Sequence, residues 1–208
     1  MFGTVSAPYW DDKPVVLVGG GPSLKGFKFD QLKSKNAYVV GVNQALFDAP
    51  CCAGVSADVM FMHVRRTALE SFAKKFPIYA CVPENIDPTS MIHLDKRWKK
   101  EFSEHPSAIH TVGSSGFAAL NIAYMKKAKR IILLGFDYGV LNRGKDHHYH
   151  HKYPWHRRTT GEWPRWAAGY ESALPQLRAA NIEVINASPQ SAIKAFPKIS
   201  IAEALKGI

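Results

Sequence analysis

The 208-residue sequence predicts an α/β fold built on a mostly parallel β-sheet. The apolar run Val15–Val18 leads directly into residues 19–23 (Gly-Gly-Gly-Pro-Ser), which is typical of a buried strand that enters a tight turn before a helix. Further along the chain, short apolar runs alternate with helical patterns. This alternation favours βαβ units, whose strands pair in parallel.

The first half of the chain predicts its elements in a regular order. After the glycine loop, residues 29–33 favour a short helix, residues 37–42 a second strand, and residues 43–47 a turn and helix start. The apolar residues 59–62 (Val-Met-Phe-Met) predict a third strand, followed by a helix at 67–75 and a strand at 77–82. Residues 83–110 contain three prolines, so we expect them to leave the sheet.

In the second half, Ser114, Ser115 and Gly116 predict a helix start with hydroxyl capping, followed by a helix to residue 128 and a strand at 130–135. Residues 137–166 show no sustained periodicity, and a long ordered loop of this kind is usually functional. The chain then predicts a helix at 167–180, a strand at 182–186 and a helical piece at 201–206.

Composition favours one globular domain that contains no membrane span. Hydrophobic residues make up 46% of the chain, enough for a real core, whereas the strongly apolar runs are four to five residues long. The first residues lack the basic and apolar regions of a secretory signal, so we expect a cytoplasmic protein. The three cysteines, of which two are adjacent, predict reduced thiols rather than a disulfide framework or a zinc finger.

The formal net charge is +10, so the electric field of the protein attracts anions. Nucleotides, phosphorylated substrates and a nucleic-acid backbone all fit this charge. Basic residues cluster at 96–100, 126–130 and 143–158, and the third cluster is interleaved with aromatic residues. A solvated basic surface explains the first two clusters equally well.

The glycine loop is the first candidate binding site. Glycines permit close approach of the backbone, and exposed amides at a helix start favour an anion, so the loop predicts a phosphate cradle. Its spacing is neither G-x-G-x-x-G nor the P-loop, which needs a Lys-Ser/Thr pair. A plain tight turn between strand and helix is the alternative.

Polar side chains follow three further predicted strands. Asn43 and Gln44 follow the second strand, His63 the third, and Asp137 the strand at 130–135. Ligands of open parallel sheets collect at the carboxyl ends of the strands, so these side chains predict one shared pocket with the glycine loop. Helix capping is the alternative role for Asn43.

Several short motifs in this order resemble those of the bacterial sialyltransferases of glycosyltransferase family 42. They are residues 15–24 (VVLVGGGPSL), 42–44 (VNQ), 58–63 (DVMFMH), 114–116 (SSG), 134–138 (LGFDY) and the tail at 182–196. The Gly-Pro-Ser-Leu loop and the Gly-x-Asp end are also similar to the broader superfamily of hydroxymethylpterin diphosphokinases and motility-associated glycosyltransferases.

The resemblance implies a single Rossmann-like domain over residues 1–208, with residues 139–166 as a His- and Trp-rich lid. It implies a nucleotide sugar of the cytidine type as donor, with no obligatory metal or other cofactor. The residues that would contact the donor phosphate, sugar, ribose or base are Gly19, Gly20, Gly21, Pro22, Ser23, Asn43, Gln44, His63, Ser114, Ser115, Gly116 and Asp137. Three positions depart from the family pattern. Gly20 and His63 stand where the family carries asparagine, and Gly139 stands where it carries a second aromatic residue after its aspartate.

The histidine-rich residues 146–151 and 156–158 occupy the place of the family's lid. Histidine titrates near neutral pH, so His151 or His156 is the expected general base for direct displacement. The resemblance implies that a tyrosine steadies the departing phosphate; Tyr138, Tyr149 and Tyr153 could do so, and Tyr138 is our choice. Metal binding by the clustered imidazoles and a solvated loop without a site are the alternatives. The tryptophans of this region fit a hydrophobic lid or a small core beneath the loop.

The leading hypothesis is therefore a transferase that uses a nucleotide-activated donor, with glycosyl transfer first. The second hypothesis is a Mg²⁺-dependent diphosphokinase that acts on a hydroxymethyl group, for which Asp58 and Asp137 are the available carboxylates. The third is a phage-type protein that modifies or binds nucleic acid. The sequence leaves open whether the acceptor is a glycan or a nucleic acid, and whether the chain forms a homo-oligomer.

Overall fold

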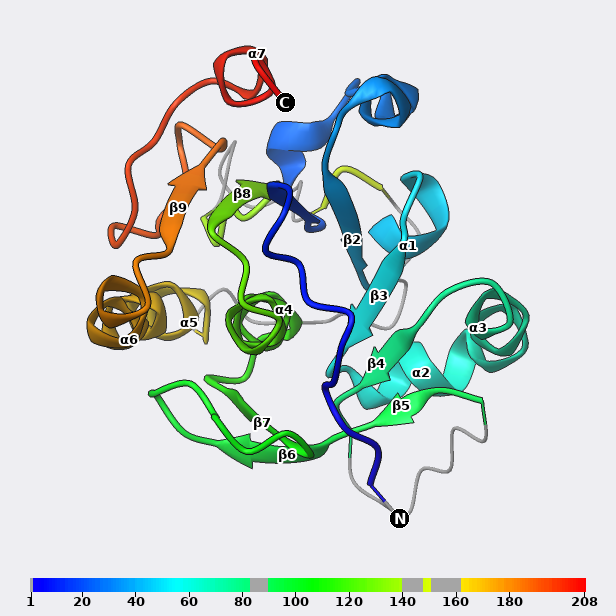
Figure 1. Cartoon of the computed structure of the whole chain (residues 1–208). Helices are drawn as coiled ribbons and strands as arrows, with labels where there is room; N and C mark the ends of the chain where they lie inside the picture. The colour runs from blue at the N-terminus through cyan, green and yellow to red at the C-terminus, as the bar shows by residue number, and fades with distance from the viewer. Residues whose placement is uncertain (1, 83–89, 140–147, 151–161) are drawn as a thin grey trace.

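The computed structural model describes residues 2–82, 90–139, 148–150 and 162–208. Its main sheet has seven strands in the order β5-β4-β3-β2-β1-β8-β9, and all pairs within it are parallel (Figure 1). These strands are β1 (Val15–Val18), β2 (Tyr38–Val42), β3 (Ala53–Ser56), β4 (Ile78–Ala80), β5 (Ile92–His93), β8 (Arg130–Leu134) and β9 (Glu183–Asn186). The predicted α/β class with a mostly parallel sheet is confirmed.

Helices cover both faces of this sheet, and a small second sheet lies beside it. The helical segments are η1 (Pro22–Leu24), η2 (Phe29–Ser34), α1 (Ala45–Asp48), α2 (Val59–Val64), α3 (Arg66–Ala73), α4 (Ser115–Met125), α5 (Trp163–Gly169), η4 (Tyr170–Ala173), α6 (Leu174–Ala179) and α7 (Ile201–Ala204). The second sheet pairs β6 (Asp95–Trp98) with β7 (Ala108–Thr111) in parallel. No helix in the described parts of the chain has the length and apolar character that a membrane crossing requires.

The alternation of side chains along β1 explains the layered core. Val15 and Leu17 point to one face, where they join a cluster that includes most of α4. Val16 and Val18 point to the other face and pack with residues of η1, η2 and α7. Because both faces of the central strands are covered, β1 reads as a continuous apolar run rather than as an alternating one.

Three expectations about the elements are wrong. Residues 59–62 do not form the third strand, because Asp58 caps a helix there: its Oδ1 accepts a hydrogen bond from the Phe61 backbone N–H at 3.1 Å. The third strand is β3 (Ala53–Ser56), which lies just before Asp58. Residues 83–110 do not leave the sheet entirely, since β5 adds an edge strand to it. The helix expected at 167–180 is divided into α5, η4 and α6, and Pro175 opens the last of these.

The strand order reverses direction at β1. The chain passes from β1 through β2, β3 and β4 to β5 on one side, then returns to β8 and β9 on the other side. In open parallel sheets, ligands bind outside the carboxyl ends of the strands at such a switch point, here between β1 and β8. The sequence-predicted glycine loop and Asp137 both lie at this position.

Candidate functional site

The glycine loop that follows β1 is tied closely to the end of β8. The Gly19 N–H donates to the Leu134 carbonyl at 2.7 Å, and the Gly21 N–H donates to the Gly135 carbonyl at 2.8 Å. A Cβ built on Gly21 would lie 1.7 Å from Asp137 Oδ2 and 2.6 Å from the Gly135 oxygen. These two glycines are therefore required for close packing between loop and strand, and their amides are already engaged within the protein.

Asp137 follows β8 and is held by Ser23 of the glycine loop. The Ser23 hydroxyl donates to Asp137 Oδ2 at 2.8 Å, and the Ser23 backbone N–H lies 3.4 Å from the same oxygen. The Ser23 hydroxyl also contacts that of Ser188, beyond the end of β9, at 3.2 Å. The ends of β1, β8 and β9 thus meet at one carboxylate, and Ser188 is a member of this group that sequence reasoning missed.

The Asp137 carboxylate is 2% exposed, and its burial raises its pKa above the ordinary value, although the hydrogen bonds from Ser23 oppose that shift. Its second oxygen, Oδ1, has no hydrogen-bond partner among the residues that the structure describes. A buried acceptor without a partner costs about 1–3 kcal/mol. Such an oxygen is suited to accept a hydrogen bond from a hydroxyl or amino group of a ligand, but not to approach a phosphate.

The end of β2 supplies two amide side chains. Asn43 has a left-handed backbone, with φ at +54°, and its Oδ1 accepts from the Ser56 hydroxyl at 2.8 Å. Gln44 is buried and donates through Nε2 to both carboxylate oxygens of Asp48, at 3.2 and 3.3 Å. Asparagine tolerates the left-handed region better than other residues with a Cβ, so Asn43 both shapes this turn and presents an amide at the strand end.

The start of α4 gathers hydroxyl groups beside Asp137. As predicted, Ser114 caps the helix, since its Oγ accepts from the N–H groups of Gly116 and Phe117 at 3.1 and 3.3 Å. The same hydroxyl bonds to that of Tyr138, which in turn lies 2.9 Å from the Tyr170 hydroxyl. A Cβ on Gly116 would lie 2.4 Å from the Tyr138 hydroxyl oxygen, so glycine lets both phenols reach the positive end of the helix.

Ser115, the next residue of α4, links this helix to the end of β3. Its hydroxyl accepts from the Ala57 backbone N–H at 3.0 Å. Burial holds the pKa of Tyr170 well above its usual range, so this phenol keeps its proton at neutral pH. The helix start is therefore an organised group of neutral hydroxyls, fixed against two strands.

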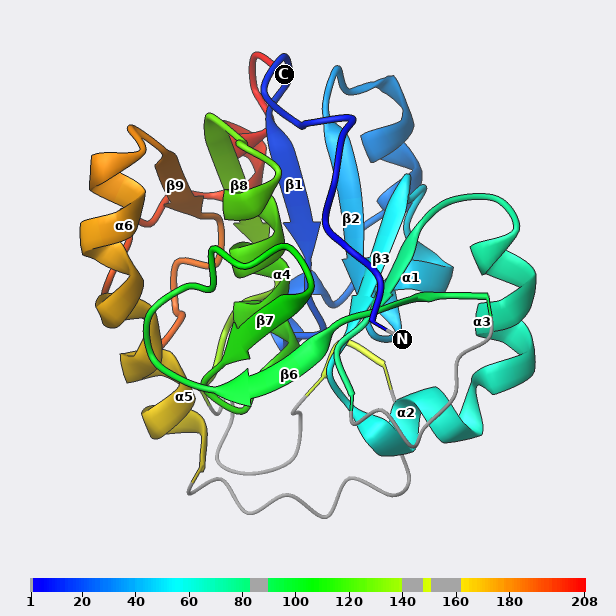
Figure 2. The ribbon, with the colours of Figure 1, turned by 60° about the horizontal axis from the view of Figure 1, so that its bottom comes forward.

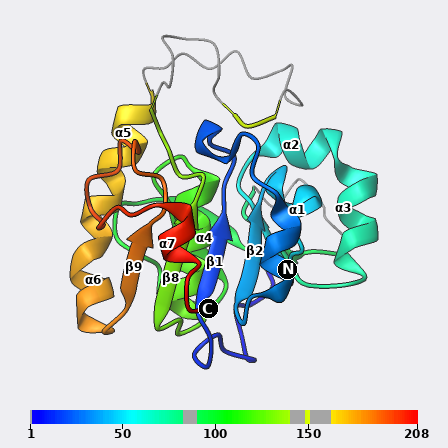
Figure 3. The ribbon, with the colours of Figure 1, turned by 90° about the horizontal axis from the view of Figure 1, so that it is seen from above.

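Residues 148–150 cross the glycine loop beyond the carboxyl end of β1 (Figure 3). The Tyr149 backbone N–H donates to the Gly20 carbonyl at 3.1 Å, and His148 Nδ1 lies 3.2 Å from the same oxygen. The Tyr149 hydroxyl donates to Asp48 at 2.8 Å, and the imidazoles of His148 and His150 stack with centroids 5.2 Å apart. This part of the predicted lid segment therefore lies directly on the glycine loop.

Gly20 is the loop residue that leaves room for this contact. A Cβ built on it would meet His148 Nδ1 at 3.1 Å, and the next atoms that it would meet among the described residues also belong to the imidazoles of His148 and His150. Its own N–H, unlike those of Gly19 and Gly21, has no partner among the described residues. Gly20 is therefore the position in the loop where an incoming anion finds an unengaged amide.

The other sequence-predicted residues are placed differently. Pro22 is buried at the start of η1, where its missing N–H costs nothing. His63 does not follow a strand but is exposed on α2, one helical turn beyond the capping Asp58. The expected bases His151 and His156 lie outside the described residues. No group of three or more metal-binding side chains occurs within the described segments, which exclude most of the histidine-rich run.

The arrangement brings together, at one edge of the sheet, a loop amide that is unengaged among the described residues, a buried carboxylate, two amide side chains, a group of phenols and two imidazoles. An anion fits the loop and helix start, whereas hydroxyl or amino groups fit Asp137.

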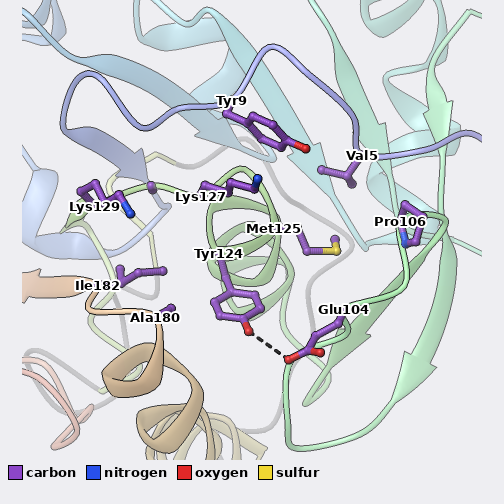
Figure 4. Close-up of a pocket in the computed structure, with 11 residues that line it drawn as sticks. Val5, Tyr9, Glu104, Pro106, Tyr124, Met125, Lys127, Lys129, Ala180 and Ile182 are labelled. Atoms are coloured by element: carbon purple, nitrogen blue, oxygen red, sulfur yellow. Dashed lines mark hydrogen bonds between the residues drawn. The ribbon is translucent and has the colours of Figure 1, made fainter.

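A hollow of about 410 Å³ lies at the opposite edge, between the N-terminal segment, the end of α4 and the start of β9, near Tyr124 and Lys127 (Figure 4). Being at the amino ends of β8 and β9, it does not share these groups.

No protein-family model matches the chain, and no curated protein matches its sequence. Solved structures do match in three dimensions. The α-2,3-sialyltransferase Cst-I of Campylobacter jejuni superposes with a TM-score of 0.57 at 15% identity, over 89% of this chain and 80% of that one. Sialyltransferase CstII of the same organism, in complex with cytidine-5'-monophosphate, gives 0.53 at 13% identity, over 91% and 86%. CstII with CMP-3FNeuAc gives 0.51 at 16% identity, over 94% and 89%. The chain is thus similar in fold, along most of its length, to bacterial sialyltransferases.

Proposed function

We propose that the chain is a glycosyltransferase that uses a nucleotide-activated sugar of the cytidine type. The observation that carries this proposal is Asp137: a buried carboxylate with one oxygen unpartnered among the described residues, at the switch point of the sheet. Such an oxygen fits the ribose hydroxyls or base amino group of a nucleotide. The fold likeness to enzymes solved with CMP and a CMP-sugar makes cytidine the first nucleotide to test.

In this proposal the donor lies across the carboxyl ends of β1, β2 and β8. Its phosphate faces the Gly20 N–H and the start of α4, and Asn43 and Gln44 contact the phosphate and sugar. The Tyr138 hydroxyl, held by Ser114 and Tyr170, donates to the departing phosphate. Gly21 and Ser23 act by fixing Asp137, since their polar groups are already bonded within the protein.

The proposed reaction is a direct displacement. An acceptor hydroxyl oxygen forms a bond to the anomeric carbon while the bond from that carbon to the donor phosphate oxygen breaks. The electron pair leaves with the nucleoside monophosphate, and the hydroxyl proton passes to a lid histidine, for which His151 and His156 stay our candidates. The displacement needs no metal step, because neutral hydroxyl and amide donors offset the charge of the leaving phosphate.

Nucleotide binding tests this proposal directly. At about 100 times its dissociation constant, a ligand stabilises the folded state by about 2.7 kcal/mol. For a domain of this size we expect CMP, without metal, to raise the Tm by roughly 5–10 °C. UMP, GMP and AMP serve as matched ligands, and release of CMP from a CMP-sugar is the activity assay.

A response to ATP with Mg²⁺, without a response to CMP, would instead support the diphosphokinase hypothesis. That reaction needs carboxylates to hold the metal, and one of the two expected ones, Asp58, caps α2 through Oδ1. If no nucleotide shifts the Tm, both transferase hypotheses fail.

A further inference from the structure

β6 ends on a tryptophan that is unusually accessible. The side chain of Trp98 is 64% exposed, whereas the other described tryptophans, Trp10, Trp163 and Trp166, are at most 8% exposed. Single exposed apolar side chains are common on protein surfaces, so the exposure of Trp98 gains meaning only from the groups around it.

The Trp98 ring is nevertheless held in place. β6 pairs with β7 in parallel, with Trp98 opposite Thr111, and the edge of the ring rests on Gly113. A Cβ on Gly113 would lie 2.8 Å from Trp98 Cζ3, and the φ of +99° there also favours glycine. Lys96 Nζ lies 5.7 Å from the ring centroid and donates to the Ala57 carbonyl at 2.8 Å. The ring is thus a fixed platform rather than a freely rotating side chain.

Positive charge surrounds this platform. Residues 95–101 contain four basic and two acidic side chains, Lys96, Arg97, Lys99, Lys100, Asp95 and Glu101. The acidic residues pair with Arg97 at 2.7 Å and with Lys99 at 4.0 Å, and these pairs are exposed, so solvent weakens them. The surface keeps an excess of positive charge, and the whole chain carries +10.

The platform lies next to the candidate site. Gly113, on which the ring rests, directly precedes Ser114, whose hydroxyl bonds to that of Tyr138 beside Asp137. β6 and β7 run together along one side of the molecule, and β6 ends beside the start of α5 (Figure 2). A polymer that lies along β6 would therefore reach the carboxyl edge of the main sheet.

We infer that the end of β6, defined by Lys96, Arg97, Trp98, Lys99 and Lys100, binds single-stranded nucleic acid, with one base stacked on the Trp98 ring and the flanking phosphates on the basic side chains. A fixed aromatic ring beside basic residues is the combination that binds single strands without sequence preference. A duplex keeps its bases stacked inside, so it cannot use the ring. A neutral glycan can stack on the ring but gains nothing from four basic side chains.

The test uses fluorescence anisotropy of the full chain with fluorescein-labelled (dT)12 at about 50 mM salt. We expect Trp98→Ala to weaken binding roughly 5- to 100-fold, as removal of one stacking platform does, and Trp98→Phe to retain part of the affinity. Lys99→Ala/Lys100→Ala should weaken binding and flatten its dependence on salt, because fewer counterions are released. Lys74→Ala/Lys75→Ala, which removes two exposed lysines near the end of α3, is the matched control and should change binding little.

The inference is overturned if the oligonucleotide does not bind, if Trp98→Ala leaves its affinity unchanged, or if a 12-base-pair duplex binds as tightly as the single strand. Oligonucleotide binding at Trp98 does not depend on the proposed glycosyl transfer. Only the further idea that the bound strand is the acceptor rests on the proposed function. The Tm shift with CMP, measured on the same variants, separates the two. CMP binding without oligonucleotide binding overturns this inference alone, and the reverse result overturns the proposed donor alone.

Discussion

The Ser23 hydroxyl donates to Asp137 Oδ2 at 2.8 Å and joins the loop after β1 to the end of β8. Both groups lie at the switch point of the sheet, and the other carboxylate oxygen has no partner among the described residues. The protein thus buries a carboxylate whose hydrogen bonding is incomplete. That is a cost in stability unless a ligand completes it.

Asp137→Asn is expected to separate stability from binding. Burial raises the pKa of Asp137, so the folded state takes up this proton more readily than the unfolded chain. The contribution of Asp137 to the free energy of unfolding is therefore greatest below the pKa that this carboxyl has in the unfolded chain. It falls as the pH rises through the higher pKa of the folded state. Asparagine avoids this loss, so the stability of the variant relative to wild type should increase between pH 4 and pH 7, as measured by urea unfolding.

The same variant should lose the Tm shift with CMP, because the amide no longer offers two acceptor oxygens. Asp30→Asn, which changes an exposed carboxylate paired with Lys33, is the control and should keep that shift. An Asp137→Asn protein that is less stable at pH 7 and still binds CMP would contradict the role that we assign to this carboxylate.

Gly21→Ala should unfold or strongly destabilise the protein, whereas Gly20→Ala should not. The new Cβ at position 21 would lie 1.7 Å from Asp137 Oδ2 and 2.6 Å from a backbone oxygen, so loop and strand would have to separate. We expect a loss of about 3 kcal/mol or more in the free energy of unfolding. At position 20 the nearest atom is His148 Nδ1 at 3.1 Å, which a side-chain adjustment relieves. Equal losses for the two variants would rule out this account of the loop.

Asn43 allows backbone strain and ligand contact to be distinguished. Asn43→Ala removes the acceptor for Ser56 and places alanine at a φ of +54°, whereas Asn43→Gly removes the acceptor alone. Alanine should therefore cost about 1–2 kcal/mol more than glycine in thermal or urea unfolding. Both variants should weaken CMP binding to the same extent, because both lack the amide. CMP binding that survives in Asn43→Gly would leave Asn43 with a purely structural role.

Tyr138→Phe tests the proposed contact with the leaving phosphate. The hydroxyl bonds to Ser114 and lies 2.9 Å from that of Tyr170, so it is held at the start of α4 whether or not a donor is present. An interaction that strengthens as charge develops on the phosphate affects kcat more than KM, and loss of one such donor typically costs about 100-fold in kcat. A rise in KM with unchanged kcat would instead indicate ground-state binding.

Much of the fold could be predicted because β1, β2 and β8 are apolar runs bounded by glycine, proline or polar residues. β3 was missed for a physical reason. Its sequence, Ala-Gly-Val-Ser, is small because α1 packs tightly against it: a Cβ on Gly54 would lie 1.9 Å from Leu46 Cδ1. The larger residues at 59–62 gave a stronger apolar signal although they form a helix. Asp58, a good helix cap, was the signal that could have identified that helix.

The site was predicted unevenly for a related reason. Residues that directly follow a correctly placed strand, such as Asn43 and Asp137, lie at the expected edge of the sheet. Ser188 and Tyr170 join the site from the ends of β9 and α5, and no local pattern marks a serine or tyrosine as a partner of a distant carboxylate or phenol. His63 lies on α2 rather than at the end of a strand, because residues 59–62, which were expected to form the third strand, belong to that helix.

The contact between Gly20 and His148 offers a final prediction. Nδ1 of the His148 imidazole lies 3.1 Å from the place that a Cβ on Gly20 would take. Asparagine at position 20 would therefore compete with His148 for the same space. Gly20→Asn alone should cost about 1–2 kcal/mol through overpacking.

Adding His148→Ala should relieve that cost, so the two changes should couple by about 0.5 kcal/mol or more in a double-mutant cycle of urea unfolding. His148→Ala alone should cost less, since it forces no overpacking, although it removes the contact of Nδ1 with the Gly20 carbonyl at 3.2 Å and the stacking on His150. If the His148 imidazole contacts the donor and an asparagine side chain at position 20 can replace it, CMP binding should fall in His148→Ala and recover in the double variant. Additive free energies would show that the two side chains do not share one space, and binding that fails to recover would show that the asparagine does not replace the imidazole.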